Sequence, residues 1–384
     1  MRKRYVDNGH EETEAILRAI ERRISTEYNK AAKDLSDKLN DYLMRFAKKD
    51  ALKLKALAAG EITLKQYQEW YTGQVMIGKR WAEMLDTIAE DLTNADDIAR
   101  SVAFGYIPEI YAINHNYGTF QVERGGLVDT SYTLYDKQTV ERLVLDDRGD
   151  FVPKPGKRVS RHINAGKTLA WNKQQAQSVM MQAILQGESI GKIASRLETL
   201  SPTFIMEDIK GYAKMTADEI SKILSKRNRA AAIRNARTLA TGVQNAGRMD
   251  SYDRARSMGI KVKKAWLATL DSRTRHWHRE LDGETVDIDK PFENDYGEIM
   301  YPGDPEADPA NIYNCRCTLV AQIAGFEHDM SDLTERNVRK LGDMTYEEWK
   351  NEKESTSDPI DKQDQIAEHM KRVYGAEYRR YARL

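Results

Sequence analysis

The feature that most constrains this chain is an uninterrupted amphipathic pattern that runs from about His10 to Ala59. Apolar side chains recur there at steps of four and three residues, and no proline breaks the series. The apolar positions are Ile16, Ile20, Ile24, Tyr28, Ala31, Leu35, Leu39, Tyr42 and Phe46. Because this period is that of an α-helix and Gly60 is a suitable stop, we predict one long helix. A helix of this length needs other helices or a partner to cover its apolar face.

Further helices are expected along most of the chain. Asn94 is a plausible N-cap, so we place a helix end before it and a new helix after it, continuing to the aromatic region 106–117. The remaining helices are expected at 63–71, 74–93, 164–186, 189–199, 216–258 and 361–381.

Residues 118–157 differ in character from these helical blocks. Glycines at 118, 125 and 126 punctuate the segment, and a Pro-Lys-Pro-Gly run closes it at 153–156. The residues that suggest short strands are Val122, Val128, Tyr132, Leu134 and Tyr135. We therefore expect a β-hairpin-like insertion here.

The expected fold class is mainly α, with long N-terminal helices, a helical middle region and a small α+β module near residues 261–325. The domains follow this division. They are an N-terminal helical region (1–117), the β-hairpin-like insertion (118–157), a second helical region (158–260), the α+β module (261–326) and a polar helical tail (327–384).

Composition excludes several classes of protein. No run approaches the ~18–20 apolar residues of a membrane helix, and no apolar stretch follows the basic start, so neither a membrane partner nor a secretory signal is expected. Two cysteines exclude a disulfide framework. The 60 basic and 60 acidic residues balance, which argues against a general polyanion binder.

The balance hides a local asymmetry. Residues 226–264 hold eleven basic and two acidic side chains, whereas residues 280–308 hold eleven acidic side chains and one lysine. The two segments are either complementary parts of one domain, or the basic one is a surface for double-stranded DNA. The candidate DNA-binding residues are Arg227, Arg229, Arg234, Arg237, Lys261, Lys263 and Lys264.

The stretch from Trp266 to Ala324 carries the chemistry. Two strand-like runs flank it, and His276 and His278 stand two residues apart, as do Cys315 and Cys317. Residues two apart in an extended chain point the same way, so two imidazoles and two thiolates could meet at one Zn²⁺ ion. The alternative is that the cysteines pack as small apolar residues and the histidines are hydrogen-bonded loop residues. A Cys–His catalytic pair lacks a third, orienting group, and HExxH, P-loop and GxGxxG motifs are absent.

The same stretch resembles a known family. Asp271-Ser272-Arg273-Thr274-Arg275, His278 and Leu281-Asp282-Gly283 are followed by Pro302-Gly303-Asp304-Pro305 and Asn314-Cys315-Arg316-Cys317. Upstream lie Ala236-Arg237-Thr238 and the run from Gln244 to Arg248. This order is similar to that of the phage Mu F-like minor head proteins, also called phage head morphogenesis proteins, over roughly residues 160–325. The residues that fall on the family motif are Asp271, Arg275, His278, Asp282, Gly283, Cys315 and Cys317, while His276 falls between motif positions.

The resemblance implies a virion role. Members of the family are minor capsid proteins that associate with the portal protein or the major capsid protein. They are located at the portal or in the head interior, and during assembly they are in the host cytoplasm. They aid head assembly and in some cases DNA packaging or delivery. The alternatives are a zinc-assisted hydrolase or nuclease-like enzyme, with metal at His278, Cys315 and Cys317 and Asp271 or Asp282 as base, or a DNA-binding module without catalysis.

Overall fold

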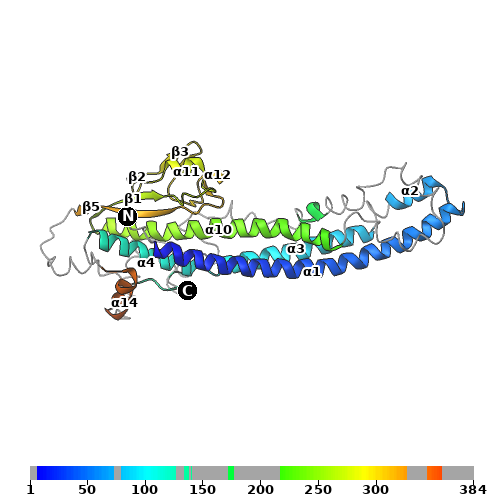
Figure 1. The fold of residues 1–384 in the computed structure, drawn as a ribbon, viewed down its shortest axis with the longest axis horizontal. Helices are drawn as coiled ribbons and strands as arrows, with labels where there is room; N and C mark the ends of the chain where they lie inside the picture. The colour runs from blue at the N-terminus through cyan, green and yellow to red at the C-terminus, as the bar shows by residue number, and fades with distance from the viewer. Residues whose placement is uncertain are drawn as a thin grey trace, which may run out of the picture. The chain divides into compact units, whose positions relative to one another are not determined.

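A computed structural model of the chain describes residues 7–72, 79–126, 134–137, 140, 172–176, 217–326 and 344–356. The described secondary structure is mainly helical, with a small sheet formed late in the chain, and this confirms the expected fold class (Figure 1). The chain divides into two compact units. The sheet unit comprises residues 1–21, 101–165 and 233–384, and the helical unit comprises residues 22–100 and 166–232.

The N-terminal part of the chain forms four helices: α1 (Asn8–Ala58), α2 (Leu64–Thr72), α3 (Lys79–Phe104) and α4 (Ile107–Gly126). The first two match their predicted positions closely. The predicted break at Asn94 is wrong, because α3 continues through this residue to Phe104. Among the helices that the structure describes, none combines the length and the apolar run needed to span a bilayer.

The prediction of a β-hairpin-like insertion from residue 118 is wrong for residues 118–126, which form the second half of α4. Gly118 and Gly125 lie within the helix, where they allow close packing. A Cβ atom on Gly118 would collide with Oγ of Ser251, and one on Gly125 would lie 2.9 Å from Ile323. Tyr135 is not in a strand either, and its ring stacks on that of His115 at 3.9 Å. Most of residues 127–157 lie outside the described part of the chain.

The middle region is represented by α10 (Ala217–Ser257), which agrees with the helix predicted at 216–258. Of the helix expected at 164–186, the structure describes residues 172–176, which are helical. The helices expected at 189–199 and 361–381 lie outside the described residues.

In the helical unit, α1, α3, α10 and residues 172–176 share a core. Its buried members are Leu35, Leu39, Leu85, Ile88, Leu92, Ala176, Ile220 and Leu224. Asp96 forms the centre of a polar network beside this core, since it accepts hydrogen bonds from Tyr28, Asn172 and Asn228. Each of the four described segments that share this core also supplies a group to the network, which specifies how these segments pack together.

In the sheet unit, three antiparallel strands are ordered β2–β1–β5, where β1 is Ile260–Leu267, β2 is Thr285–Asp287 and β5 is Thr318–Phe326. Figure 1 shows this sheet beside α10. Between β2 and β5 lie a hairpin of β3 (Phe292–Asn294) and β4 (Gly297–Ile299) and the short helix α12 (Pro309–Ile312). Another short helix, α11 (His276–Glu280), follows β1. The module expected near 261–325 therefore exists.

A buried ion pair joins the start of the chain to this unit. Nη2 of Arg248, on α10, lies 2.6 Å from Oδ1 of Asp7, and neither residue is more than 8% exposed. Arg248 also donates to Oδ1 of Asn114 on α4 and to the carbonyl of Leu319 on β5. One guanidinium thus connects the residue that precedes α1 with α4, α10 and the sheet.

A polar helical tail was predicted for 327–384, but part of it carries buried aromatic side chains. It contains α14 (Tyr346–Thr356), whose Tyr346 and Trp349 are buried against Tyr117 and Phe120 of α4. The indole N–H of Trp349 donates to Oε2 of the buried Glu123 at 2.6 Å.

Candidate metal centre

His278, Cys315 and Cys317 are brought together by loops and a short helix, not by paired strands. Strand β1 ends at Leu267, and the chain then turns into α11, which carries His278. Cys315 and Cys317 precede β5, which begins at Thr318. The expectation that the cysteines lie on an extended run is therefore wrong in detail, although their convergence with His278 is present.

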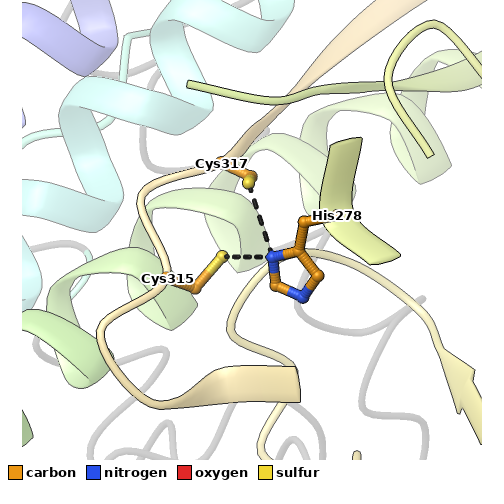
Figure 2. Close-up of side chains that lie close together, drawn as sticks. All are labelled: His278, Cys315 and Cys317. Atoms are coloured by element: carbon orange, nitrogen blue, oxygen red, sulfur yellow. Dashed lines mark hydrogen bonds between the residues drawn. The ribbon is translucent and has the colours of Figure 1, made fainter. Parts of the chain in front are cut away.

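The three side chains meet at one point (Figure 2). Sγ of Cys315 and Sγ of Cys317 each lie 3.6 Å from Nδ1 of His278. The donor atoms of all three residues lie within 4.8 Å of one another. His278 is 1%, Cys315 2% and Cys317 3% exposed, so the cluster is closed to solvent. Both cysteines are free thiols.

This geometry fits a metal ion. In a tetrahedral zinc site with Zn–S of about 2.3 Å and Zn–N of about 2.05 Å, nitrogen and sulfur ligands lie roughly 3.5 Å apart. A single ring nitrogen can form one good hydrogen bond, yet two sulfurs face Nδ1 of His278 at equal distance. An ion between the three atoms satisfies both sulfurs at once. Two thiols and one imidazole are the donors that Zn²⁺ prefers.

The hydrogen bond between the two thiols sets their pKa values apart. It raises the pKa of Cys315 well above the ordinary value for a thiol, and burial adds to that rise. The same bond lowers the pKa of Cys317 well below the ordinary value, assisted by the contact with His278 and by the backbone N–H of Thr269. A thiolate is the form of cysteine that binds a metal ion, and the contacts of the pair with each other and with His278 favour the loss of one proton.

His276 is not part of the cluster. Its side chain is 81% exposed, and Nδ1 lies 3.3 Å from Oε1 of Glu280, one turn along α11. Residues two apart on a helix point about 200° apart, so His276 and His278 face different directions. Among the residues that the structure describes, three potential ligands converge, and the expected fourth is absent from the group.

Helix α10 holds the cysteine loop through side chains that were not assigned a role from sequence. Oγ1 of Thr241 donates to the carbonyl of Cys315 at 2.6 Å, and Nδ2 of Asn245 donates to the carbonyl of Cys317 at 3.3 Å. Gly242 is needed here because a Cβ atom would lie 2.7 Å from the carbonyl oxygen of Gly303. Helix α10 thus positions the backbone of both cysteines.

The remaining motif residues shape the turns around the cluster. Asp271 pairs with Arg316, whose hydrogen bonds hold the pKa of that carboxyl well below its ordinary value. Arg275 donates to the carbonyl of Tyr313. Oδ1 of Asp282 accepts the backbone N–H of Ala268, and Gly283 has a φ of 82°, a conformation that favours glycine.

The candidate DNA-binding residues have partners within the protein. Lys264 is fully buried, with Nζ donating to the carbonyls of Ile288 and Met300, so it cannot contact phosphate. The contacts of the others are Arg227 to Gln175, Arg229 to Asn29, Arg234 over the Tyr313 ring, Arg237 to Glu21, and Lys263 to Asp287, while Lys261 also has an interaction partner. The pairs of Lys263 with Asp287 and of Arg256 with Asp289 support the complementary reading of the two charged segments.

Comparison with known families decides the relationship. Residues 174–320 match the family model described as Phage Mu protein F like protein, within the span of 160–325 expected from the motifs. This segment is Mu F-like. The Mu F-like segment includes α10, the sheet up to the start of β5 and all three cluster residues. The resemblance inferred from sequence is thereby confirmed.

Two curated proteins are similar to the chain. The Minor head protein GP7 of Bacillus phage SPP1 is 35% identical over 124 residues, which cover 32% of this chain and 40% of that protein. The NAD(+)--arginine ADP-ribosyltransferase EFV of Enterococcus faecalis is 27% identical over 256 residues, which cover 63% of this chain and 45% of that protein. The chain thus spans less than half the length of either relative. No solved structure gives a significant match to it.

Proposed function

We propose that this protein is a minor head protein of a tailed bacteriophage, located in the head interior or at the portal, which aids head assembly. The observation that carries the proposal is the Mu F-like match over residues 174–320. The similarity to the minor head protein of phage SPP1 supports it. Assembly in the host cytoplasm, with the portal protein or the major capsid protein as partner, follows from this role.

The N-terminal helices supply the surface that we assign to that partner. Met44, Lys48, Leu52 and Lys55 follow one another at steps of four, four and three residues, and so lie on one face of α1. We call this face the α1 stripe. Met44 is 52% and Leu52 67% exposed, and both lysines are exposed. Neither lysine forms an ion pair with another residue that the structure describes.

The α1 stripe fits an acidic protein surface that also offers apolar side chains. Large apolar side chains exposed between cations gain free energy when a protein covers them, whereas DNA phosphates would use the lysines alone. We therefore assign the stripe to the portal or the head shell, and not to DNA.

Incorporation into heads tests this assignment. The double variant Met44→Glu, Leu52→Glu should reduce the amount of protein in purified heads by about tenfold, because removing an apolar side chain from an interface costs roughly 1–2 kcal/mol. The matched control is Lys30→Glu, Lys33→Glu, since both residues are exposed and lie on the same helix. Equal incorporation of the apolar variant and the wild type would remove the α1 stripe from the interface.

We further propose that His278, Cys315 and Cys317 hold a Zn²⁺ ion with a structural role. A hydrolase would need access for substrate and a free carboxylate as base. All three ligands are buried, Asp271 is held by Arg316, and Asp282 accepts a backbone hydrogen bond. These contacts favour an ion that ties the end of the acidic loop to the turn after β1.

Chelation distinguishes the structural role from a catalytic one. Removal of the ion should lower the melting temperature, and Zn²⁺ but not Mg²⁺ should restore it, because thiolate and imidazole ligands discriminate against Mg²⁺. A melting temperature that does not respond to chelator, in protein shown to contain zinc, would exclude the structural role.

A further inference from the structure

Arg316 connects the two segments that carry the ligands, because its side chain binds Asp271 in the segment that leads to His278. It stands between Cys315 and Cys317 in the sequence, and both terminal nitrogens of its guanidinium donate to the carboxylate of Asp271. Nη1 donates to Oδ2 at 2.5 Å, and Nη2 donates to Oδ1 at 2.7 Å. The side chain of Arg316 is 17% exposed and that of Asp271 35% exposed. A fork of this kind fixes distance and orientation together.

Asp271 is itself fixed at the start of the turn that leads to His278. Its Oδ1 accepts the backbone N–H of Arg273 at 2.9 Å and the hydroxyl of Thr274 at 3.2 Å. Its backbone carbonyl accepts Nη2 of Arg279, the residue after His278, at 2.7 Å. The carboxylate of Asp271 is therefore hydrogen-bonded to the turn itself. A contact that fixes this carboxylate also fixes the position of α11.

Two other contacts join the same segments. Oγ1 of Thr269 donates to the carbonyl of Arg316 at 2.8 Å, and Arg275 donates to the carbonyl of Tyr313. The segment 269–279 and the segment 313–317 are thus joined at several points around the contact between His278 and the cysteines. Of these links, the pair of Asp271 and Arg316 is the one formed by two charged side chains.

We infer that Asp271 and Arg316 are positioning residues that hold His278 and the two cysteines in ligand geometry before an ion binds. This inference rests on the metal site proposed above. His278 and Cys315 are 37 residues apart in sequence, so bringing them together costs chain entropy. The ion pair orders the loop already in the metal-free protein. Metal binding therefore does not have to order the loop, and the affinity for the ion is higher.

A surface ion pair without this role would add slightly to stability and leave metal affinity unchanged. Loss of a group that orients metal ligands lowers metal affinity by roughly 10- to 100-fold. A pair that only adds stability and a pair that positions the ligands therefore predict different metal affinities and different spectra of the bound ion when the pair is removed.

Titration of the metal-free protein with Co²⁺ separates them. The thiolate-to-cobalt charge-transfer band and the visible d–d bands report affinity and coordination geometry. Arg316→Ala and Asp271→Asn should each bind Co²⁺ at least about tenfold more weakly than wild type, with altered d–d bands. The double variant should be no weaker than either single one, because the pair acts as a unit. Arg316→Lys keeps the charge but loses the fork, so its affinity should be intermediate.

Arg273→Ala is the matched control. Arg273 also neighbours Asp271, but its side chain is 68% exposed, its contact is 3.7 Å long, and its backbone N–H remains in the variant. It should bind Co²⁺ as wild type does. Circular dichroism of the metal-free variants checks the fold, and Arg316→Lys carries the test if Arg316→Ala does not fold.

The outcomes distinguish this inference from the proposal on which it rests. Wild-type protein that binds neither Co²⁺ nor Zn²⁺ would contradict the metal site itself. Wild-type protein that binds Co²⁺, with Arg316→Lys and Asp271→Asn within about twofold of its affinity and with unchanged bands, would overturn the positioning role alone.

Discussion

Two thiols face one ring nitrogen at His278, and all three side chains are buried. Without an ion, the two thiols share this one nitrogen and hydrogen-bond to each other, whereas an ion would bind all three donor atoms at once. Nε2 of His278, on the other side of the ring, has no hydrogen-bond partner in the described part of the chain. Its ring packs edge-to-face against Trp266 and Trp277, with centroids 5.2 and 6.3 Å away. We therefore expect a cation to be bound between these three donor atoms.

Replacement of a single ligand should remove both the ion and its stabilisation. Cys317→Ser should lower the free energy of unfolding by about 3 kcal/mol or more, since ligand loss uncouples metal binding from folding. Urea unfolding with and without chelator measures this. The variant should not respond to chelator, whereas the wild type should fall towards the level of the variant. His276→Ala, at an exposed position, should stay within about 0.5 kcal/mol of wild type. A chelator response retained in Cys317→Ser would contradict the ligand assignment.

The buried pair of Asp7 and Arg248 should be costly to break. Arg248→Met leaves a carboxylate buried without its partner, so the free energy of unfolding should fall by about 3–5 kcal/mol. Chemical denaturation measures the loss. The double variant Asp7→Leu, Arg248→Met should recover part of it, because no uncompensated charge remains. A loss below about 1 kcal/mol in the single variant would show that water reaches this pair.

The residue types of the metal site could be found from sequence, but their arrangement could not. The two-residue spacing predicted that His276 and His278 are both ligands, because residues two apart point the same way in an extended chain. The structure places both histidines on a short helix, where that spacing separates them. No local pattern signals a five-residue helix such as α11. The pairing of Asp271 with Arg316 depends on a loop closure that spacing does not encode.

At the scale of elements, α14 and α4 form a contact that the sequence analysis did not anticipate. Trp349 lies in a polar stretch with no amphipathic run around it, so its burial was not evident. Its partner Glu123 is fully buried and also binds Nζ of Lys353 at 3.0 Å. A carboxylate buried within α4 therefore specifies where α14 docks.

Loss of the indole should release α14. Trp349→Ala should cost about 3–5 kcal/mol, because it removes a large buried side chain and the hydrogen bond to Glu123. Limited proteolysis should then cut near residues 344–356 faster than in wild type. Glu347→Ala, at an exposed position on the same helix, is the control and should behave as wild type. Equal cleavage of Trp349→Ala and wild type would show that α14 is held by other contacts.

Long elements were predictable, and exceptions within them have identifiable causes. The apolar period extends over many turns in α1, so its predicted bounds were close to the observed ones. The helix predicted at 216–258 also agrees with α10. The glycines of α4 were interpreted as turn residues because glycine occurs both in turns and where a helix packs closely against a neighbour. Lys264 was misread because charge was counted without strand alternation, which places it on the buried face with Ile260 and Val262.

At the scale of the whole molecule, the proposed ion belongs to one of the two units. All three ligands lie in the sheet unit, and the α1 stripe lies in the helical unit. The proposed metal site and the α1 stripe are thus in separate units. Zinc loss should affect the first without abolishing the second.

Hydrogen exchange with and without chelator checks this separation. Removal of the ion should speed exchange in residues 268–284 and 309–319, where the ligand loops lie. Amides of α3 from residue 79 to residue 100, in the helical unit, should exchange at unchanged rates. Faster exchange throughout both units would mean that the metal stabilises the molecule as a single cooperative body.

The most direct test of the account is the zinc content of the purified protein. The protein should be prepared without chelators and without metal-affinity resin, and its zinc measured by elemental analysis against protein concentration. About one zinc per chain is expected for the wild type, and essentially none for Cys317→Ser, because a buried Cys–Cys–His set retains its ion through purification. Less than about a tenth of a zinc per wild-type chain would leave packing as the explanation for the cluster and would contradict the proposed metal centre.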